Sequence, residues 1–360
     1  MRILRKECAS LAKAFGDVTL VVGDGQGDAV DPASGVKIVD IGRPPGRGRL
    51  GRMVGQPWRL VRKVRALAPD VVHIHDAELL PALLVLRASG IAGIYDIHED
   101  LPKQILDKAW IPAVIRRPMS FAARLFERWV TPLLTALVPA TPAIAERFEA
   151  FHRRVVTVNN YPIADELLSD SGGGERNVLC FVGGITRIRG IRQLFDALSL
   201  VPDVKLVLCG AFESAAFESE LRQHAAWSQV DYRGVVDRPG VGAVLKQSFA
   251  GLVTYLPAAN HMEAQPTKVF EYMSAGVPVI GSDFPLWRRI IADTDAGLVV
   301  DPEDPAQIAG AIRALRDDPG RVTQMGARGR ALVMGELNWN HEAEKLVALY
   351  KTVAGARAAL

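Results

Sequence analysis

The 360-residue sequence predicts an α/β protein of two doubly wound, Rossmann-like domains that face each other across a cleft. Short β-branched or Leu-rich runs alternate with helical patterns along the chain, which is typical of parallel sheets covered on both faces. The alternation stops once, over 161–177, where Pro, Ser and Gly predict a linker. With 49% hydrophobic and 23% charged residues, the chain is long enough to build two cores.

The expected strands form one series on each side of this linker. The first series is VTLVV, VKIVDI, DVVHIH, AGIYDIH, ALVPAT and VVTVNN, beginning at residues 18, 36, 70, 92, 136 and 155. The second is VLCFVG, VKLVLCG, VDYRGVV, FAGLVTYL, VPVIGSD and AGLVVDP, beginning at 178, 204, 230, 249, 277 and 296. We therefore expect domains at 1–162 and 163–340, with a C-terminal helix at about 341–360 packing back on the first domain.

The chain opens on a helical pattern, where a sheet of this type should open on a strand. MRILRKECASLAKAF places Leu4, Leu11 and Phe15 on one face. We therefore expect the first domain to lack its usual first strand, with no strand formed before Arg5, through a misassigned start or a genuine truncation.

Composition excludes several function classes. Cys8, Cys180 and Cys209 are too few and too scattered for a disulfide framework or a zinc cluster, which fits a reducing cytoplasm. No run approaches the roughly 20 apolar residues needed to span a bilayer, and no signal peptide opens the chain. Nucleic-acid binding is a poor fit, because the Arg-rich stretch lacks interleaved aromatics and any known module.

A glycine-rich turn in FVGGITRIRGIRQLFDAL predicts an anion site. Gly183, Gly184 and Gly190 let a ligand approach the backbone, and the following helix offers unpaired amides. Arg187 and Arg189 add positive charge, as a diphosphate would require. Taken alone, such a turn is equally typical of a plain strand-to-helix connection.

A second candidate site lies in EAQPTKVFEYMSAGVPVIGSDFP, where a helix should begin near Gln265 and end near Gly276. An anion at its start would meet free amides and Lys268, while Glu271 could accept hydrogen bonds from a ribose diol. Glu263, just before the helix, could bind sugar hydroxyls. The alternative is a capped surface helix in which Lys268 and Glu271 form an i, i+3 ion pair.

In the first domain, IYDIHED ends a strand with polar groups that should point into the cleft. These are Asp96, His98, Glu99 and Asp100. The alternatives are a loop or capping role for His98 and capping roles for the acids, since Asp100 precedes the helical pattern PKQIL. His73, His75 and Asp76 of HIHD suggest a metal, but no further ligand cluster is evident and we expect none.

Nearly the whole chain resembles the GT-B glycosyltransferases of family 4, which are retaining and use nucleotide-diphosphate sugars. The most specific element of this resemblance is a pair of glutamates separated by seven residues, which in this chain are Glu263 and Glu271. The segments FVGGITRIRG and QPTKVFEYMSAGVPVIGSDFP look like donor-site segments of that family. HIHDAELLP, IYDIHEDLPKQIL, NNYP and NHMEAQPTKVFEYM resemble bacterial enzymes that assemble surface or capsular polysaccharides.

The resemblance implies a role for each candidate residue. Domain 1–162 would take a glycan or lipid-linked acceptor, and domain 163–340 would bind a UDP- or GDP-sugar. Glu271 would bind the ribose and Glu263 the donor sugar, and His98 would lie beside the reacting sugar carbon. The implied catalytic residues are His98, Glu263, Lys268 and Arg189; the implied donor-binding residues are Gly183, Gly184, Arg187, Arg189, Gln265, Pro266, Thr267, Lys268 and Glu271; the acceptor-side residues are Asp96, His98, Glu99 and Asp100.

One position departs from the family pattern. Many members carry Arg directly after the first glycine of the turn, where this chain has Gly184. Arg187 or Arg189 must then supply the charge. No metal or other cofactor is expected, because two helix ends, Arg189 and Lys268 can hold a diphosphate. Rival readings are a sugar-nucleotide 2-epimerase of the same fold and a noncatalytic sugar-nucleotide-binding protein.

Cations are concentrated in the first half of the chain, which suggests a cytoplasmic enzyme that is peripheral to an anionic membrane. One stretch without acids holds Arg43, Arg47, Arg49, Arg52, Arg59, Arg62, Lys63 and Arg65, with Met53, Trp58 and Leu60 interspersed. RRPMSFAARLFERWVTPLL, from Arg116, follows. In the alternative, the arginines only solvate a loop and Phe121, Leu125 and Trp129 pack into the core.

Overall fold

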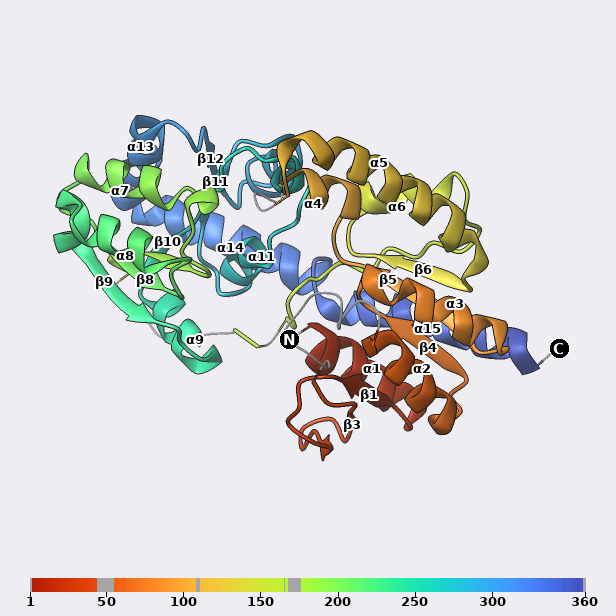
Figure 1. Cartoon of the computed structure of the whole chain (residues 1–360). Helices are drawn as coiled ribbons and strands as arrows, with labels where there is room; N and C mark the ends of the chain where they lie inside the picture. Colours follow the sequence, from red (N-terminus) through yellow and green to blue (C-terminus); the bar gives the residue numbers. More distant parts are fainter. Residues whose placement is uncertain (1, 44–54, 108–110, 165, 168–175, 359–360) are drawn as a thin grey trace. The chain divides into compact units, whose positions relative to one another are not determined.

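The computed structural model describes residues 2–43, 55–107, 111–164, 166–167 and 176–358, which form two compact α/β units (Figure 1). Unit 1 comprises Met1–Asn160 together with Trp339–Leu360, and unit 2 comprises Tyr161–Asn338. Most of the expected linker lies outside the described residues.

Unit 2 contains one parallel six-stranded sheet in the order β12-β11-β10-β7-β8-β9. Every strand of the second predicted series is confirmed. The strands are β7 (Val178–Val182), β8 (Lys205–Cys209), β9 (Val230–Gly234), β10 (Ser248–Val253), β11 (Val279–Ser282) and β12 (Gly297–Val300). The direction of winding reverses between β7 and β10, so the crevice where ligands bind in such sheets lies at the carboxyl ends of these two neighbours.

Alternate residues of β7 enter different cores, which shows that helices cover both faces of this sheet. Leu179 and Phe181 join one hydrophobic cluster, while Cys180 and Val182 join the other. The helices of the unit are α7 (Ile191–Ser199), α8 (Ala215–Arg222), α9 (Arg238–Lys246), α10 (Ala259–Met262), α11 (Thr267–Ser274), α12 (Pro285–Ile291), α13 (Pro305–Arg316) and α14 (Pro319–Gly335).

The described strands of unit 1 form two separate three-stranded sheets, in the orders β1-β3-β2 and β4-β5-β6. The strands are β1 (Thr19–Val22), β2 (Ala29–Val30), β3 (Lys37–Asp40), β4 (Val71–Ile74), β5 (Ala92–Ile97) and β6 (Ala136–Pro139), and only the β2–β3 pair is antiparallel. The short β2 was not expected. The predicted strand VVTVNN is not a regular strand, but it runs beside β6: Val155 bridges to Leu137, and the amides of Val156 and Val158 donate to the carbonyls of Leu137 and Pro139.

Four helices of unit 1 matter for the arguments below. They are α2 (Gln56–Leu67), α4 (Leu101–Asp107), α5 (Ala113–Val130) and α6 (Pro142–Glu149), with α3 (Leu80–Ala88) beside α2. On α5, the expected alternative of core packing is wrong, because Phe121, Leu125 and Trp129 are all exposed. Among the described helices, none combines the length and the apolar character that crossing a bilayer requires.

The beginning of the chain is helical, and no strand precedes Thr19 in described residues 2–43, as predicted. A π-helix over Arg2–Cys8 leads into α1 (Ala9–Phe15). Leu11 is buried as expected, but Phe15 is exposed. Instead of an apolar face, the π-helix buries charged side chains, namely Arg2, Lys6 and Glu7.

The helix α15 (Trp339–Ala358) belongs to unit 1 although unit 2 precedes it in the chain. The Trp339 indole donates a hydrogen bond to Ser10 Oγ at 2.9 Å, and the Tyr350 hydroxyl lies 2.9 Å from His73 Nδ1. These contacts tie α15 to α1 and to β4.

Candidate functional site

The glycine-rich turn follows β7 in unit 2, where the sheet reverses its winding. Gly183 has φ of 151° and Gly190 has φ of 70°, conformations that favour glycine. A Cβ on Gly190 would stand 1.9 Å from the Thr254 carbonyl oxygen, so only glycine lets the turn lie against the end of β10. The turn then opens α7, whose start has no side-chain cap.

Arg189 folds back over this turn. Its Nη1 donates a hydrogen bond to the Gly184 carbonyl oxygen at 3.2 Å, and its guanidinium lies 5.3 Å from the centre of the Tyr255 ring. A Cβ on Gly183 would stand 2.9 Å from Nη1 of Arg189, so the missing side chain makes room for the guanidinium. Arg189 therefore places a cation on the turn itself.

Arg187 points away toward α8, although it is only two residues from Arg189. Its guanidinium pairs with Glu220 and lies 4.4 Å from the centre of the Phe217 ring, and its Nε lies 3.6 Å from Glu213. The side chain is exposed and already neutralised by these two carboxylates. Of the two arginines offered by the sequence, the structure thus places Arg189 at the turn.

The second segment begins its helix later than expected. Pro266, with ψ of 124°, is the N-cap of α11 rather than part of its first turn, so the helix starts at Thr267. No side chain caps this start. Glu263 is exposed and follows α10 directly.

Glu271 is buried in α11 and held by two cations. Lys268 Nζ lies 2.6 Å from one of its carboxylate oxygens, which is the i, i+3 pair of the alternative reading, and Arg238 Nη1 lies 2.8 Å from the other. Burial alone would raise the pKa of Glu271, but Lys268 and Arg238 bring it below its usual value. Glu271 is therefore a carboxylate with both oxygens directed at cations.

Arg238 was not predicted as a site residue. It is the first residue of α9, where Asp237 caps the helix, and it also pairs with Glu166 through Nη2 at 2.5 Å. A signal was present in the sequence, because Asp-Arg-Pro after an expected strand predicts a helix start at the carboxyl edge of the sheet.

Three of the buried polar atoms that lack a hydrogen-bond partner in the described residues belong to loops of unit 2. They are Thr186 Oγ1, Thr254 Oγ1 and Gln265 Oε1. Tyr255, which follows Thr254, lies beneath the Arg189 guanidinium, and burial raises its pKa. Buried polar groups without partners are uncommon, so these three are candidates to contact a bound ligand.

In unit 1, Asp96 at the end of β5 organises two histidines. His75 Nδ1 and His98 Nε2 each lie 3.0 Å from the same carboxylate oxygen, and Arg2 Nη2 donates to the other oxygen at 3.1 Å. Burial would raise the pKa of Asp96, but Arg2 and the two histidines hold it well below its usual range. Asp96 is fully buried, whereas His98 keeps part of its ring exposed.

The other acceptor-side candidates have structural partners. Asp100 is buried, accepts a hydrogen bond from the Lys103 amide at 3.1 Å and lies 2.7 Å from Arg147 Nη1, so it has the capping role that the alternative predicted. Glu99 is exposed and accepts a hydrogen bond from Gln104.

A set with metal-ligand geometry occurs near Asp96, with members that the sequence did not indicate. Ligand atoms of Glu7, His73, His75 and Asp96 lie within 4.8 Å of one another, whereas Asp76 is not among them. The Arg2 guanidinium already pairs with both carboxylates, at 2.5 Å and 3.1 Å. Burial lowers the pKa of His73 to about 3, so this ring is neutral. The expectation that His73 and His75 have no further ligand cluster beside them is therefore wrong, and the cluster is salt-bridged through Arg2.

Comparison with known proteins identifies the chain. The family model described as "Glycosyl transferases group 1" matches residues 168–332, and that described as "Glycosyltransferase Family 4" matches residues 2–161. The chain is a GT-B glycosyltransferase of the family 4 type. A glycosyltransferase is an enzyme that transfers sugars, so the epimerase and noncatalytic readings are set aside.

Relatives of this glycosyltransferase align with most of its length. The phosphatidyl-myo-inositol mannosyltransferase of Mycobacterium leprae is 26% identical over 337 residues, covering 88% of this chain and 84% of the relative. That of Mycobacterium tuberculosis (strain H37Rv) is 29% identical over 309 residues, covering 80% and 75%. A glycogen synthase from the same strain is 22% identical over 301 residues, covering 79% and 69%.

Solved structures share the fold of the glycosyltransferase. Sucrose-phosphate synthase from Thermosynechococcus elongatus superimposes with a TM-score of 0.77 at 17% identity, covering 98% of this chain and 93% of the other. Anabaena Alr3699/HepE in complex with UDP-glucose gives a TM-score of 0.64 at 15% identity, covering 96% and 100%.

Proposed function

We propose that this glycosyltransferase is retaining and moves a sugar from a nucleotide-diphosphate sugar to a glycan or lipid-linked acceptor in cell-surface polysaccharide biosynthesis. The observation that carries the proposal is the edge of unit 2 where the Val182 amide, at the end of β7, donates a hydrogen bond to the Tyr272 hydroxyl of α11. There, Glu271 is a buried carboxylate between two cations, and buried polar atoms lack partners among the described residues.

We assign the donor-binding groups from this geometry together with the family resemblance. Glu271 would accept the two hydroxyls of the ribose, releasing Lys268 and Arg238 from its oxygens. The diphosphate would then lie between the glycine-rich turn that carries Arg189 and the starts of α7 and α11, where backbone amides and cations would contact it. Glu263 would bind the donor sugar. Arg187, paired on the surface, is left out of the assignment.

The chemistry follows from where charge develops. As the bond between the sugar and the diphosphate breaks, negative charge grows on the leaving oxygen and positive charge grows on the sugar ring. Arg189 and the helix amides are fixed in place, and Lys268, once released from Glu271, adds a further cation; together they favour that charge separation over the ground state. In the resembling family the acceptor attacks from the same face, and the leaving phosphate takes its proton. His98, held by Asp96, is assigned a place beside the reacting carbon.

The names of related proteins support the choice of substrates. Anabaena Alr3699/HepE has been solved with UDP and with UDP-glucose, and the mycobacterial relatives are named for phosphatidyl-myo-inositol. A UDP-sugar is therefore the first donor to test, with a GDP-sugar next because the family resemblance allows it, and a lipid-linked acceptor is the first class of acceptor. We place the enzyme in the cytoplasm, at the inner face of the membrane.

A donor screen tests this function. Purified protein is titrated with UDP, GDP and ADP, and then incubated with the matching sugar nucleotides with and without a lipid or glycan acceptor. We expect one nucleotide to bind clearly better than the others, and its sugar to appear on the acceptor with the anomeric configuration of the donor. Chelation with EDTA should leave the rate unchanged, because protein cations take the role of a metal. Inversion of the anomeric centre would refute retention, and a product without acceptor would refute transfer.

A further inference from the structure

The helix α5 turns its apolar side chains toward solvent. Val114 is 83% exposed, Phe121 is 64% exposed and Trp129 is 76% exposed. The large apolar residues of this helix that are exposed are Val114, Ile115, Met119, Phe121, Leu125, Phe126 and Trp129. Such a contiguous set is rare on a soluble monomer unless the surface binds something.

The inward side of α5 carries polar groups beside Val130, which joins the hydrophobic core at the end of the helix. Glu127 is buried, and its carboxylate lies 2.6 Å from Nη2 of Arg147 on α6. Ser120 Oγ donates a hydrogen bond to the Pro102 carbonyl oxygen of α4 at 2.8 Å. With about 100° of rotation per residue, Glu127 and Ser120 lie nearly opposite Leu125 and Trp129. The contacts of Glu127 and Ser120 therefore fix α5 with its exposed apolar side chains directed outward.

A row of cations borders the apolar face. Arg117, Arg124 and Arg128 recur at i, i+7 and i+11, which places them along one edge of the helix. The only acid of α5, Glu127, is buried and paired on the other side. The exposed surface of α5 is thus both apolar and positively charged.

We propose that α5 is a membrane-binding helix that lies in the headgroup layer of an anionic bilayer, with Phe121, Leu125 and Trp129 inserted and Arg117 and Arg124 at the lipid phosphates. Charge complementarity favours this partner over a second copy of the chain, whose α5 would present the same cations. A helix with Trp, Phe and Leu on one side and arginines beside them is typical of interfacial binding.

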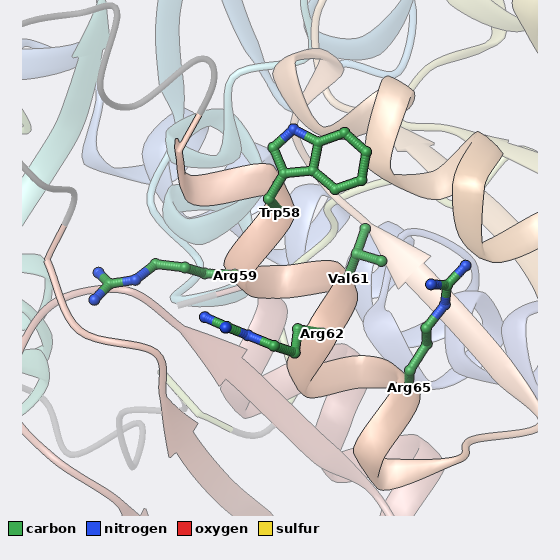
Figure 2. Close-up of a pocket in the computed structure, with 5 residues that line it drawn as sticks. All are labelled: Trp58, Arg59, Val61, Arg62 and Arg65. Carbon is green, nitrogen blue, oxygen red and sulfur yellow. The ribbon is translucent and has the colours of Figure 1, made fainter.

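The other basic helix of unit 1 has an ordinary surface. On α2, Leu60, Val61 and Val64 are buried, so its apolar face points inward. Trp58 and four neighbours line a pocket of about 420 Å³, and Figure 2 shows Arg59 and Arg62 extending from the helix in the same direction. Figure 1 shows α2 and α5 well apart within the unit. The remaining residues of the basic stretch, Arg47, Arg49, Arg52 and Met53, lie outside the described residues.

The exposed large apolar side chains of α2 are Trp58 and Leu67, which lie nine positions apart and so on opposite sides of the helix. Because α2 carries cations without a continuous apolar face, it supplies a control for vesicle binding. We compare sedimentation with phosphatidylglycerol-containing vesicles and with pure phosphatidylcholine vesicles. Wild type should bind only the anionic vesicles, and less tightly at high salt. The double substitution Arg117→Ser and Arg124→Ser should weaken binding about 25-fold at low salt. Removing the same charge from α2, by Arg62→Ser and Arg65→Ser, should leave the affinity nearly unchanged.

Apolar insertion is tested separately. Phe121→Ser with Trp129→Ser should weaken binding by about 100-fold, because two large apolar side chains then remain in water. These side chains are exposed, so circular dichroism should show an unchanged fold. Lipids brominated in the acyl chain should quench tryptophan fluorescence in wild type and in Trp58→Phe, but not in Trp129→Phe.

Two results would overturn the proposal. One is vesicle binding that survives both α5 double substitutions. The other is a wild-type protein that does not bind anionic vesicles but sediments as a dimer that Phe121→Ser with Trp129→Ser dissociates, since α5 would then join two copies. The inference rests on the proposed membrane location of the enzyme. Its test measures lipid binding alone, while the donor screen measures sugar transfer, so failure of this inference is distinguishable from failure of the proposed function.

Discussion

Replacing Arg189 by alanine is expected to lower kcat by about 10²–10³-fold, the usual cost of removing one preorganised group that stabilises transition-state charge. The guanidinium is held on the glycine-rich turn by the Gly184 carbonyl and the Tyr255 ring, before any ligand arrives. Its charge acts most strongly when the diphosphate leaves, so KM for the donor should change much less than kcat. Steady-state kinetics with the donor identified by the screen measure both constants.

Arg187→Ala is the matched control, because it removes the same side chain two residues away. Arg187 pairs with Glu220 and Glu213 on the exposed surface of unit 2. Its loss should leave kcat nearly unchanged. A large loss of kcat in Arg187→Ala together with a small one in Arg189→Ala would reverse the assignment and show that Arg187 leaves α8 when the donor binds.

Replacing Glu271 by alanine should weaken nucleotide binding by about 1.5–3 kcal/mol, the range for hydrogen bonds to a charged group. The two carboxylate oxygens that now face Lys268 and Arg238 would otherwise accept the ribose hydroxyls. Because these cations lower its pKa, Glu271 is ionised and ready to accept at neutral pH. Isothermal titration calorimetry with the free nucleoside diphosphate gives the loss directly, without a turnover step.

The control for Glu271 is Glu166→Ala, which removes only the second partner of Arg238. Arg238 then keeps its contact with Glu271, so nucleotide affinity should be nearly unchanged. Removing Glu271 also leaves two cations without their buried partner, so thermal unfolding must show that Glu271→Ala is folded at the temperature of the titration. Unchanged affinity in a folded Glu271→Ala protein would remove the ribose assignment.

The sequence correctly predicted those elements whose secondary structure depends on their own residues. Eleven of the twelve expected strand segments form strands, because β-branched runs bounded by turn residues are decided locally. VVTVNN is the exception: it pairs with Leu137 and Pro139 of β6 through a few backbone hydrogen bonds without forming a regular strand. The predicted start of α11 was two residues too early. Pro266 takes an extended ψ, which a proline permits as readily as a helical one.

Features made by distant pairs were not predictable from the sequence. Nothing near Glu271 indicates Arg238, which is 33 residues away, or that Arg189 and Arg187 would point apart. The burial of Arg2 and Glu7 depends on Asp96 at the end of another strand. On α5 the amphipathic pattern was visible, but pattern alone cannot tell which side of a helix faces the protein. There the contact between Glu127 and Arg147 decided it.

The placement of α15 makes the two units unequal as the chain is synthesised. Unit 2 is one continuous stretch, so all of its strands and helices are available once residue 338 has left the ribosome. Unit 1 is discontinuous, and the partners of Ser10 and His73, namely Trp339 and Tyr350, are made last. Domains generally fold as units during synthesis. Here the unit that is begun first is completed second.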